Sequence, residues 1–293
     1  MATEKIPPQE TGSLAVVATP IGNLGDITER AVAALKQADL VAAEDTRHTG
    51  RLLQHLGLSK SMFALHDHNE RAQVETLLDR VEAGENVALV SDAGTPLISD
   101  PGYIVVRRAH ERGLRVLPIP GACAAIAALC VSGLPTDRFV FEGFLPAKAA
   151  ARRSRLEALE NEARTLVFYE SPHRLMATID VLVSVFGPER PVVLARELTK
   201  AFETLYAVSL GRLQAIALAD PNVSRGELVL VVGGAAEQVK PEETLLDTDR
   251  LMRRLIQELP VKTAVRVVAD LSGQPRNALY QRALTIQREN LGD

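Results

Sequence analysis

Cysteines, aromatic residues and long apolar runs are all scarce in this 293-residue chain. The two cysteines, Cys123 and Cys130, are seven positions apart in a segment that we expect to form one helix. Two cysteines on one helix argue against a disulfide framework and against a zinc site built from thiolates. This use of cysteine fits a reducing compartment, and we expect the protein to be cytoplasmic.

The longest apolar run, Ala122–Val131, is much shorter than the roughly 18 residues that a membrane-spanning helix needs. The segment Met1–Gly12 is polar, contains two adjacent prolines, and has no apolar core of a secretory signal peptide. We therefore expect neither a membrane span nor export.

Charge is distributed unevenly along the chain. The whole sequence has 33 Lys and Arg against 37 Asp and Glu, a net charge of −4. Residues 250–293 hold eight basic and four acidic side chains, so this tail carries +4 and the first 249 residues carry −8. A basic tail indicates either a local site for an anionic partner or a solvated helical face.

Apolar periodicity predicts strands that alternate with helices, which is typical of an α/β fold with a mostly parallel sheet covered by helices. The turn-rich segment 132–136 divides this pattern into an N-terminal α/β domain, residues 13–133, and a C-terminal α/β domain, residues 137–234. After a polar linker, residues 247–293 show three helical patterns. The turn at residues 272–275 makes this tail resemble a helix-turn-helix unit.

Polar residues before several helical patterns predict where those helices begin. Asp26 is expected to cap a helix over residues 27–37, and Asn69 a helix that ends at Ala83. Asp100 is expected to form a turn or cap before the helix at residues 103–112. Ser171, followed by a proline, is expected to cap a helix that runs to Phe186.

Three glycine-containing turns follow predicted strands, at Thr19–Asp26, Ser91–Pro96 and Pro118–Ala122. Ligands of α/β sheets bind at the carboxyl ends of strands, and glycine lets backbone N–H groups approach a ligand closely. One such turn is usually a simple connection, whereas three in one domain favour a bound small molecule. The dinucleotide-binding and Walker patterns are both absent. Asp92, directly at a strand end, is expected to face the ligand.

Other polar clusters are less specific. Residues 44–48 resemble a solvated loop, and residues 66–70 offer two histidines without a clear third ligand, so we expect no metal site. Glu170 ends a strand before two basic residues in the first helical turn, where they oppose the helix dipole. This local conflict indicates a function. The charged segment Arg196–Lys200 is either a salt-bridged loop or part of a polar cleft.

Six segments together resemble one known family. They are Val17–Thr28, Ala42–His48, Leu89–Gly102, Ser132–Pro135, Phe168–Arg174 and Arg196–Lys200. Over about residues 13–234 the chain is similar to the ribosomal RNA small subunit methyltransferase I family of the tetrapyrrole-methylase superfamily. The tail resembles that family's C-terminal helical extension.

The resemblance implies a two-domain tetrapyrrole-methylase fold with S-adenosylmethionine (AdoMet) bound between the domains. It implies methyl transfer to the ribose 2′-oxygen of a cytidine in the decoding centre of 16S ribosomal RNA. The superfamily usually forms homodimers. Its usual Gly-Asp-Pro cofactor loop is replaced here by Ser91–Pro96, which separates the chain from the porphyrin-type members.

The resemblance also implies the site residues. The cofactor-binding set is Pro20, Asp92, Ala93, Gly94, Thr95, Pro96, Ile98, Ser99, Cys123, Ala124, Tyr169, Gly226 and Glu227. For catalysis, Lys200 is the leading candidate for the general base, because a desolvated lysine can have a lowered pKa. Glu197 would orient this lysine, Arg196 would position a phosphate, and Glu170 is the alternative base.

Two other functions remain open at this point. A methyltransferase of the same fold could act on a small molecule or a protein side chain, and the acidic net charge favours this slightly. A catalytically silent assembly factor could bind AdoMet or RNA, but the polar strand ends at Glu170, Glu197 and Lys200 argue against it. The expected partner is 16S ribosomal RNA or the small ribosomal subunit.

Overall fold

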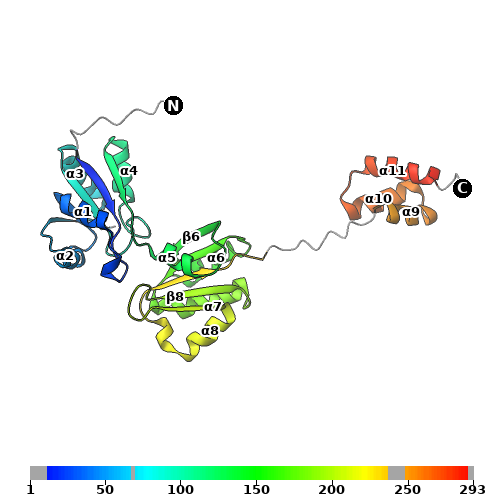
Figure 1. The fold of residues 1–293 in the computed structure, drawn as a ribbon. Coiled ribbons are helices and arrows are strands. Elements are labelled where there is room, and N and C mark those ends of the chain that lie inside the picture. Colours follow the sequence, from blue (N-terminus) through cyan, green and yellow to red (C-terminus); the bar gives the residue numbers. More distant parts are fainter. Residues whose placement is uncertain (1–11, 67–69, 237–247, 290–293) are drawn as a thin grey trace. The chain divides into compact units, whose positions relative to one another are not determined.

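The computed structural model describes residues 12–66, 70–236 and 248–289. The chain forms two compact units, Met1–Ala235 and Ala236–Asp293 (Figure 1). The larger unit contains two five-stranded sheets, and the smaller one contains three helices. The predicted α/β class is confirmed, while the division of the larger unit into two domains at residues 132–136 stays a prediction.

The first sheet has the strand order β3-β2-β4-β1-β5, and all its neighbouring strands are parallel. Its strands are β1 (Ser13–Val17), β2 (Leu40–Ala43), β3 (Ser61–Ala64), β4 (Asn86–Val90) and β5 (Arg115–Ile119). Because these strands are parallel, the turns after β1, β2, β4 and β5 all emerge at one edge of the sheet.

Helices cover both faces of this sheet. They are α1 (Glu29–Gln37), α2 (Thr46–His55), α3 (Glu70–Glu82) and α4 (Tyr103–Glu111). Alternate residues of a strand point to opposite faces. Val41 and Val90 accordingly pack in the core with α1 and α2, whereas Leu40 and Leu89 pack in the core with α3 and α4. Burial on both faces explains the nearly continuous apolar runs of these strands.

The second sheet departs from the sequence-based prediction. Its order is β6-β7-β10-β8-β9, and only β6 and β7 pair in parallel. Its strands are β6 (Phe139–Phe144), β7 (Thr165–Glu170), β8 (Pro191–Arg196), β9 (Thr204–Ser209) and β10 (Leu228–Val232). Strands β7 and β8 run in the same direction, but β10 inserts between them antiparallel to both. The prediction of a mostly parallel sheet is therefore wrong here, because strand insertion leaves no local sequence signal.

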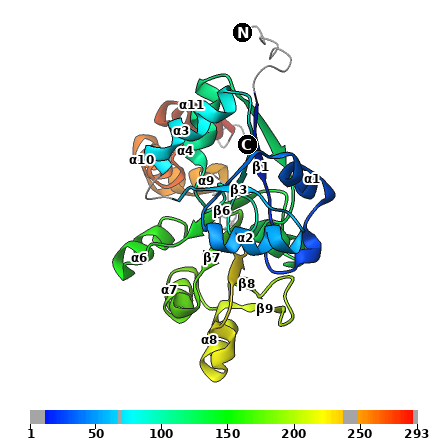
Figure 2. The same ribbon diagram turned by 90° about the vertical axis from the view of Figure 1, so that its left-hand side faces the viewer.

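Helices also cover both faces of the second sheet (Figures 1 and 2). These helices are α5 (Ala124–Val131), α6 (Ala149–Glu157), α7 (Leu175–Phe186) and α8 (Leu210–Ala219). Phe168 and Leu230 pack with α6, α7 and α8, while Val167 and Val229 pack with α5. Ile21, from the turn after β1, joins the α5 cluster and so ties the two sheets together.

Two predicted caps are wrong. Asp26 ends a short 3-10 turn, η1 (Leu24–Asp26), and the N-cap of α1 is Thr28, whose hydroxyl accepts from the Ala31 N–H at 3.1 Å. Of the turn or cap expected at Asp100, the cap is wrong, because the N-cap residue of α4 is Gly102. The buried carboxylate of Glu70 accepts from the N–H groups of Gly102, Ile104 and Val105 at 2.9–3.2 Å. This cap comes from another helix, so no local pattern could reveal it.

The predicted cap at Ser171 is also wrong for α7, whose N-cap residue is Arg174. Ser171 precedes a 3-10 turn, η2 (Pro172–Arg174), makes no side-chain cap, and α7 begins only at Leu175. The predicted cap at Asn69 lies outside the described residues. Another 3-10 turn, η3 (Pro221–Ser224), connects α8 toward β10.

The smaller unit has the three predicted helices, α9 (Thr248–Glu258), α10 (Val261–Ser272) and α11 (Arg276–Glu289). They enclose their own core, which includes Met252, Val268 and Ile286. Gly273 ends α10 with a φ of +67°, a conformation that favours glycine. Among the helices in the described ranges, none is both long enough and apolar enough to cross a membrane.

We predict that Glu70→Ala lowers the free energy of unfolding by about 2–3 kcal/mol, because three N–H groups at the start of α4 lose a charged acceptor. Urea unfolding of the purified variant would measure this change. Glu75→Ala, which removes only exposed ion pairs to Arg108 and Arg112, is the matched control and should cost less. Equal losses in the two variants would contradict the capping role.

Candidate functional site

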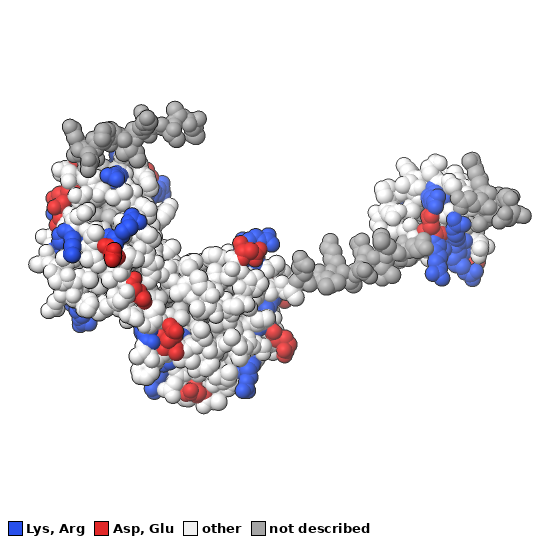
Figure 3. All heavy atoms as spheres, in the orientation of Figure 1, with Lys and Arg blue, Asp and Glu red and all other residues white. Residues whose placement is uncertain are grey.

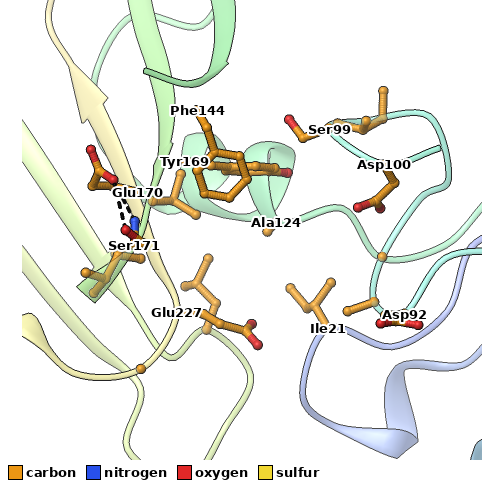
Figure 4. Close-up of a pocket in the computed structure, with 18 of the residues that line it drawn as sticks. Ile21, Asp92, Ser99, Asp100, Ala124, Phe144, Tyr169, Glu170, Ser171 and Glu227 are labelled. Atoms are coloured by element: carbon orange, nitrogen blue, oxygen red, sulfur yellow. Dashed lines mark hydrogen bonds between the residues drawn. The ribbon is translucent and has the colours of Figure 1, made fainter. Parts of the chain in front are cut away.

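A pocket of about 440 Å³ lies where the ends of strands from both sheets meet (Figure 4). The first sheet contributes the segments that follow β1, β2 and β4. The second sheet contributes the carboxyl ends of β7 and β8 and the amino end of β10. Because β10 is antiparallel to its neighbours, its beginning lies at the same edge as their ends. The pocket therefore occupies the strand edge at which α/β proteins bind ligands.

The structure brings together most of the residues predicted to bind a cofactor. Those that line the pocket are Asp92, Ala93, Gly94, Thr95, Ile98, Ser99, Ala124, Tyr169, Gly226 and Glu227. Pro20, Cys123 and Pro96 do not line it. Pro20 borders a neighbouring pocket of about 260 Å³, which Asp92 also lines, whereas Pro96 borders neither pocket. Cys123 is the N-cap residue of α5.

Several other residues that line the pocket were not predicted from the motifs. They are Ile21, Glu44, Asp100, Phe144, Ser171, Pro172, Ala195, Leu198, Leu228 and Val229. Asp100 could have been found, because residues 99–102 echo the Ser-Asp-x-Gly pattern of residues 91–94. Phe144 follows an irregularity in the β6–β7 register at Gly143, and a glycine inside a predicted strand is the signal that could have indicated it.

The three glycine-containing turns converge beside the pocket. The Thr19 N–H donates to the Gly94 carbonyl at 2.8 Å, and the Gly94 N–H donates to the Thr19 carbonyl at 3.1 Å. The Thr95 hydroxyl donates to the Ala122 carbonyl at 2.9 Å. Gly94 has a φ of +82°, and a Cβ there would come within 3.2 Å of the Ile21 side chain. The backbone conformation therefore favours glycine at this position, and a Cβ would in addition require the Ile21 side chain to shift.

Asp92 is held by the loop that follows β2. Its carboxylate accepts from the Asp45 N–H at 3.0 Å. Asp45 is the N-cap of α2, and its hydrogen bonds with the Arg47 side chain and N–H hold its own pKa well below the usual range. The polar segment at residues 44–48 is thus a support for Asp92 rather than only a solvated loop.

An aromatic cluster forms one wall of the pocket. Tyr169 makes edge-to-face contacts with Phe141 and Phe144, with ring centroids 5.0 and 5.6 Å apart. Its hydroxyl accepts from the Ala125 N–H at 3.1 Å, at the first turn of α5. Burial is the main cause that raises the pKa of this phenol. Tyr169 is therefore neutral and fixed in orientation.

Glu170 lies at the edge of the pocket, but its carboxylate is already occupied (Figure 4). One oxygen accepts from the Ser171 N–H at 2.7 Å and the other from the Thr178 hydroxyl at 2.6 Å. Arg174 lies 3.3 Å from the carboxylate, and Glu170 is 3% exposed. This geometry favours a structural role for Glu170 and argues against its role as the alternative general base.

Lys200 joins two carboxylates at the mouth of the pocket. Its Nζ lies 3.0 Å from Glu197 Oε1 and 3.1 Å from Glu227 Oε1. Glu197 Oε1 also accepts from the Glu227 N–H at 2.8 Å. A Cβ at Gly22 would collide with the Lys200 stem, and a Cβ at Gly226 would collide with the Glu197 carboxylate. The predicted orientation of Lys200 by Glu197 is present as a direct contact.

The pKa of Lys200 shifts in the direction opposite to our expectation. Partial burial opposes its charged form, but the hydrogen bonds to Glu197 and Glu227 outweigh this and raise the pKa above its ordinary value. A lysine that keeps its proton cannot accept one, so the expectation of a lowered pKa is wrong in this state of the protein. The missing information was the second carboxylate, which β10 places beside the lysine.

Arg196 does not present a free guanidinium to a phosphate. Its Nε donates to the Arg225 carbonyl at 2.8 Å, and its Nη1 donates to the Phe202 carbonyl at 3.0 Å. Arg196 therefore connects two loops at the edge of the site.

No group of three or more potential metal ligands was found within the ranges that the structure describes. His66 lies within those ranges, whereas His68 of the same predicted cluster does not. Binding without metal stays a prediction.

Comparison with known proteins identifies relatives over nearly the whole chain. The family profile "Tetrapyrrole (Corrin/Porphyrin) Methylases" matches residues 13–214, and the profile "RsmI C-terminal HTH domain" matches residues 242–287. Ribosomal RNA small subunit methyltransferase I of Escherichia coli O157:H7 is 54% identical over 276 residues, covering 94% of this chain and 96% of that protein. Its counterpart from Haemophilus influenzae is 52% identical, covering 94% and 97%.

Solved structures show the same fold at much lower identity. The methyltransferase CobJ superposes with a TM-score of 0.57 at 21% identity, covering 79% of this chain and 98% of that one. Uroporphyrin-III C-methyltransferase from Thermus thermophilus, complexed with S-adenosylhomocysteine, gives a TM-score of 0.53 at 20% identity, covering 76% and 97%.

We predict that the stabilising effect of Glu197 depends on pH. Burial acts to raise its pKa, but the hydrogen bonds from the Glu227 N–H and from Lys200 outweigh it, so the folded-state value lies below the ordinary 4.5. A carboxyl whose pKa is lowered by folding stabilises the protein above its ordinary pKa, and this stabilisation is lost as the pH falls through the folded-state value. Glu197→Gln should therefore be less stable than the wild type at pH 7, and the difference should shrink below about pH 4.5. Urea unfolding at several pH values would measure it, and a constant difference would contradict the assignment.

Proposed function

Because this chain belongs to the ribosomal RNA small subunit methyltransferase I family of tetrapyrrole methylases, we propose that it methylates the ribose 2′-oxygen of a cytidine in the decoding centre of 16S ribosomal RNA, with AdoMet as methyl donor. The observation that carries this proposal is the convergence of three glycine-containing turns on one pocket at the strand edge. The proposed substrate is 16S ribosomal RNA, either free or within the small subunit.

The pocket has the size and chemistry for AdoMet. Its volume, about 440 Å³, lies within the range of small-molecule sites. Ile21 and Phe144 offer apolar surface for an adenine ring, while Asp92 and Asp100 offer acceptors for hydroxyl and ammonium groups. Because Gly94 has no side chain, its backbone can approach a bound ligand closely. When bound, AdoMet supplies an electrophilic methyl group on a sulfonium.

The chain's own residues would orient the acceptor and stabilise its charge. A ribose hydroxyl is a weak nucleophile, so a positive charge beside the developing alkoxide would accelerate the reaction. We assign this role to the Lys200 ammonium, which Glu197 and Glu227 hold at the pocket mouth. Glu227, whose side chain is 68% exposed and lines the pocket, is placed to accept the hydroxyl proton. Holding the acceptor hydroxyl in line with the methyl group would supply the rest of the rate acceleration.

We also propose that the protein is a cytoplasmic homodimer. Helix α5 is apolar on all sides, yet Ile126 and Val131 on its outer side are 46% and 51% exposed. A helix of this composition is normally buried, which supports coverage by a second copy. The free thiols of Cys123 and Cys130 fit a reducing compartment.

The experiment that tests the function is methyl transfer from labelled AdoMet to small ribosomal subunits and, separately, to free 16S RNA. Mapping of the modified nucleotide should locate a 2′-O-methylcytidine in the decoding centre. Transfer to neither RNA substrate, with transfer to a small molecule or a protein instead, would support the alternative methyltransferase function. AdoMet binding without any transfer would support the silent assembly factor.

We predict that Gly94→Val abolishes AdoMet binding, because a branched side chain is strained at a φ of +82° and collides with Ile21. Calorimetry in the presence of a chelator would measure binding, and circular dichroism would establish that the variant is folded. Gly113→Val is the control, because Gly113 also has a positive φ but has open space around it and lies outside the pocket. Normal binding by folded Gly94→Val would show that the loop at residues 92–96 does not hold the cofactor.

We predict that Lys200→Ala lowers the single-turnover methylation rate by about 10²–10³-fold, the usual effect of removing a group that stabilises developing charge. AdoMet affinity should change little, because Lys200 lies outside the pocket lining. Lys200→Arg should retain more activity than Lys200→Ala if the role is electrostatic, since arginine keeps the charge. Complete loss in both variants would instead point to a lysine that acts as a base after the carboxylates are displaced.

We predict that deletion from Thr248 onward weakens binding to RNA and reduces its dependence on salt. On the face of the helical unit shown in Figure 3, Lys and Arg side chains gather on one side. Because this unit has its own core, its removal leaves the cores of residues 12–236 intact. Binding measured between 50 and 200 mM salt, roughly the range over which phosphate contacts show their effect, would test this. An unchanged salt slope would mean that the tail has a purely structural role.

A further inference from the structure

Phe202 is the most exposed large hydrophobic side chain in the described ranges, at 73%. It lies in the loop between β8 and β9, residues 197–203, which we call the Phe202 loop. A single exposed apolar side chain is common on protein surfaces, so what distinguishes Phe202 is its place in the loop that carries Lys200.

The Phe202 loop is tightly built, so the exposure does not come from a slack chain. The Phe202 carbonyl accepts from Arg196 Nη1 at 3.0 Å and from the Thr204 hydroxyl at 3.1 Å. The Thr199 N–H donates to Glu203 Oε2 at 2.6 Å. Glu197 and Thr199 both have left-handed backbone conformations, with φ of +53° and +64°. Such strain is held only where surrounding contacts determine the backbone, and it concentrates at functional sites.

The loop brings Phe202 close to the proposed methyl acceptor. Two residues of chain span at most about 7 Å, so the Phe202 backbone lies within that distance of Lys200. Lys200 contacts Glu227, which lines the cofactor pocket. Phe202 therefore belongs to the same short loop as Lys200, the residue that we assign to the acceptor ribose.

The backbone carbonyls of Phe202 and Arg225 lie close together, because one guanidinium binds both. The guanidinium of Arg196 that binds the Phe202 carbonyl also binds the Arg225 carbonyl, at 2.8 Å, and so joins the two loops. Arg225 is exposed and immediately precedes Gly226 of the pocket lining. In the part of the chain that the structure describes, its side chain has no hydrogen bond or ion pair. The neighbouring acidic groups are engaged elsewhere, since Glu197 and Glu227 pair with Lys200 and Glu203 accepts from Thr199.

An exposed aromatic ring beside an unneutralised arginine is the combination that binds single-stranded RNA. The ring stacks on an unpaired base, and the guanidinium binds a phosphate. We propose that Phe202 stacks on a base that flanks the target cytidine and that Arg225 binds the adjacent phosphate. Arg196 is the positioning residue that sets the spacing of the two. This inference rests on the proposed function and adds the residues that hold the substrate.

Binding of a labelled single-stranded oligoribonucleotide to the full chain, with AdoMet present, tests the proposal. Phe202→Ala should weaken this binding and raise the KM for small subunits by about 5- to 150-fold, the range expected for one base stacked on an aromatic ring. The single-turnover rate at saturating subunit should stay near that of the wild type. Phe202→Trp should restore binding, whereas Phe202→Leu, apolar but without an aromatic face, should not. Leu218→Ala is the matched control, because Leu218 on α8 is 70% exposed and neither lines the pocket nor belongs to the Phe202 loop.

Arg225→Ala should weaken RNA binding and reduce the slope of log affinity against log salt by about 1, as expected for one lost phosphate contact. If Phe202→Leu bound the oligoribonucleotide as tightly as the wild type, stacking would be overturned. Unchanged oligoribonucleotide binding by Phe202→Ala would overturn it as well. A change of oligomeric state in Phe202→Ala would also overturn the proposal, because it would make this surface a protein interface. Failure of the proposed function would give a different result. A wild type that binds the oligoribonucleotide through Phe202 but methylates no subunit would contradict the reaction and leave the stacking supported.

Discussion

The pair of backbone hydrogen bonds between Thr19 and Gly94 is the constraint on which the site depends. It ties the turn after β1 to the loop after β4, and the Thr95 hydroxyl extends the connection to the turn after β5. Backbone groups that pair with each other in this way fix the loops without relying on side chains. The turns can therefore form a wall for the pocket, and glycine suits position 94 because its φ of +82° is strained for other residues.

The opposite wall depends on the antiparallel insertion of β10. If β10 ran parallel to β7 and β8, its first residues would lie at the far edge of the sheet. In the observed direction, Gly226 and Glu227 lie beside the ends of β7 and β8, where Glu197 and Lys200 are found. One reversal of strand direction thus assembles a lysine with two carboxylates from segments about 30 residues apart in sequence.

That assembly determines the charge state of the site. A lysine buried alone would lose its proton readily, because desolvation opposes the ammonium. The two carboxylates reverse this balance for Lys200, and the hydrogen bonds of Glu197 leave its carboxylate ionised. Lys200 therefore stays an ammonium, whose N–H groups suit donation to a developing alkoxide better than proton abstraction. Glu170, expected as a rival base, instead ties the end of β7 to α7 through Thr178.

The alternation of strands and helices, the family and the glycine-containing turns could all be predicted from the amino-acid sequence, because these features depend on residues that are neighbours along the chain. Asp92, Gly94 and Tyr169 could be assigned to one site from the amino-acid sequence alone, since short segments carry their motifs. Only the tertiary structure decided which distant groups meet. The cap that Glu70 provides to α4, the second carboxylate beside Lys200, and the clamp of Arg196 on the loops of Phe202 and Arg225 all join residues from different elements. The pKa of a side chain and the exposure of an aromatic ring depend on such neighbours, and local sequence patterns do not contain that information.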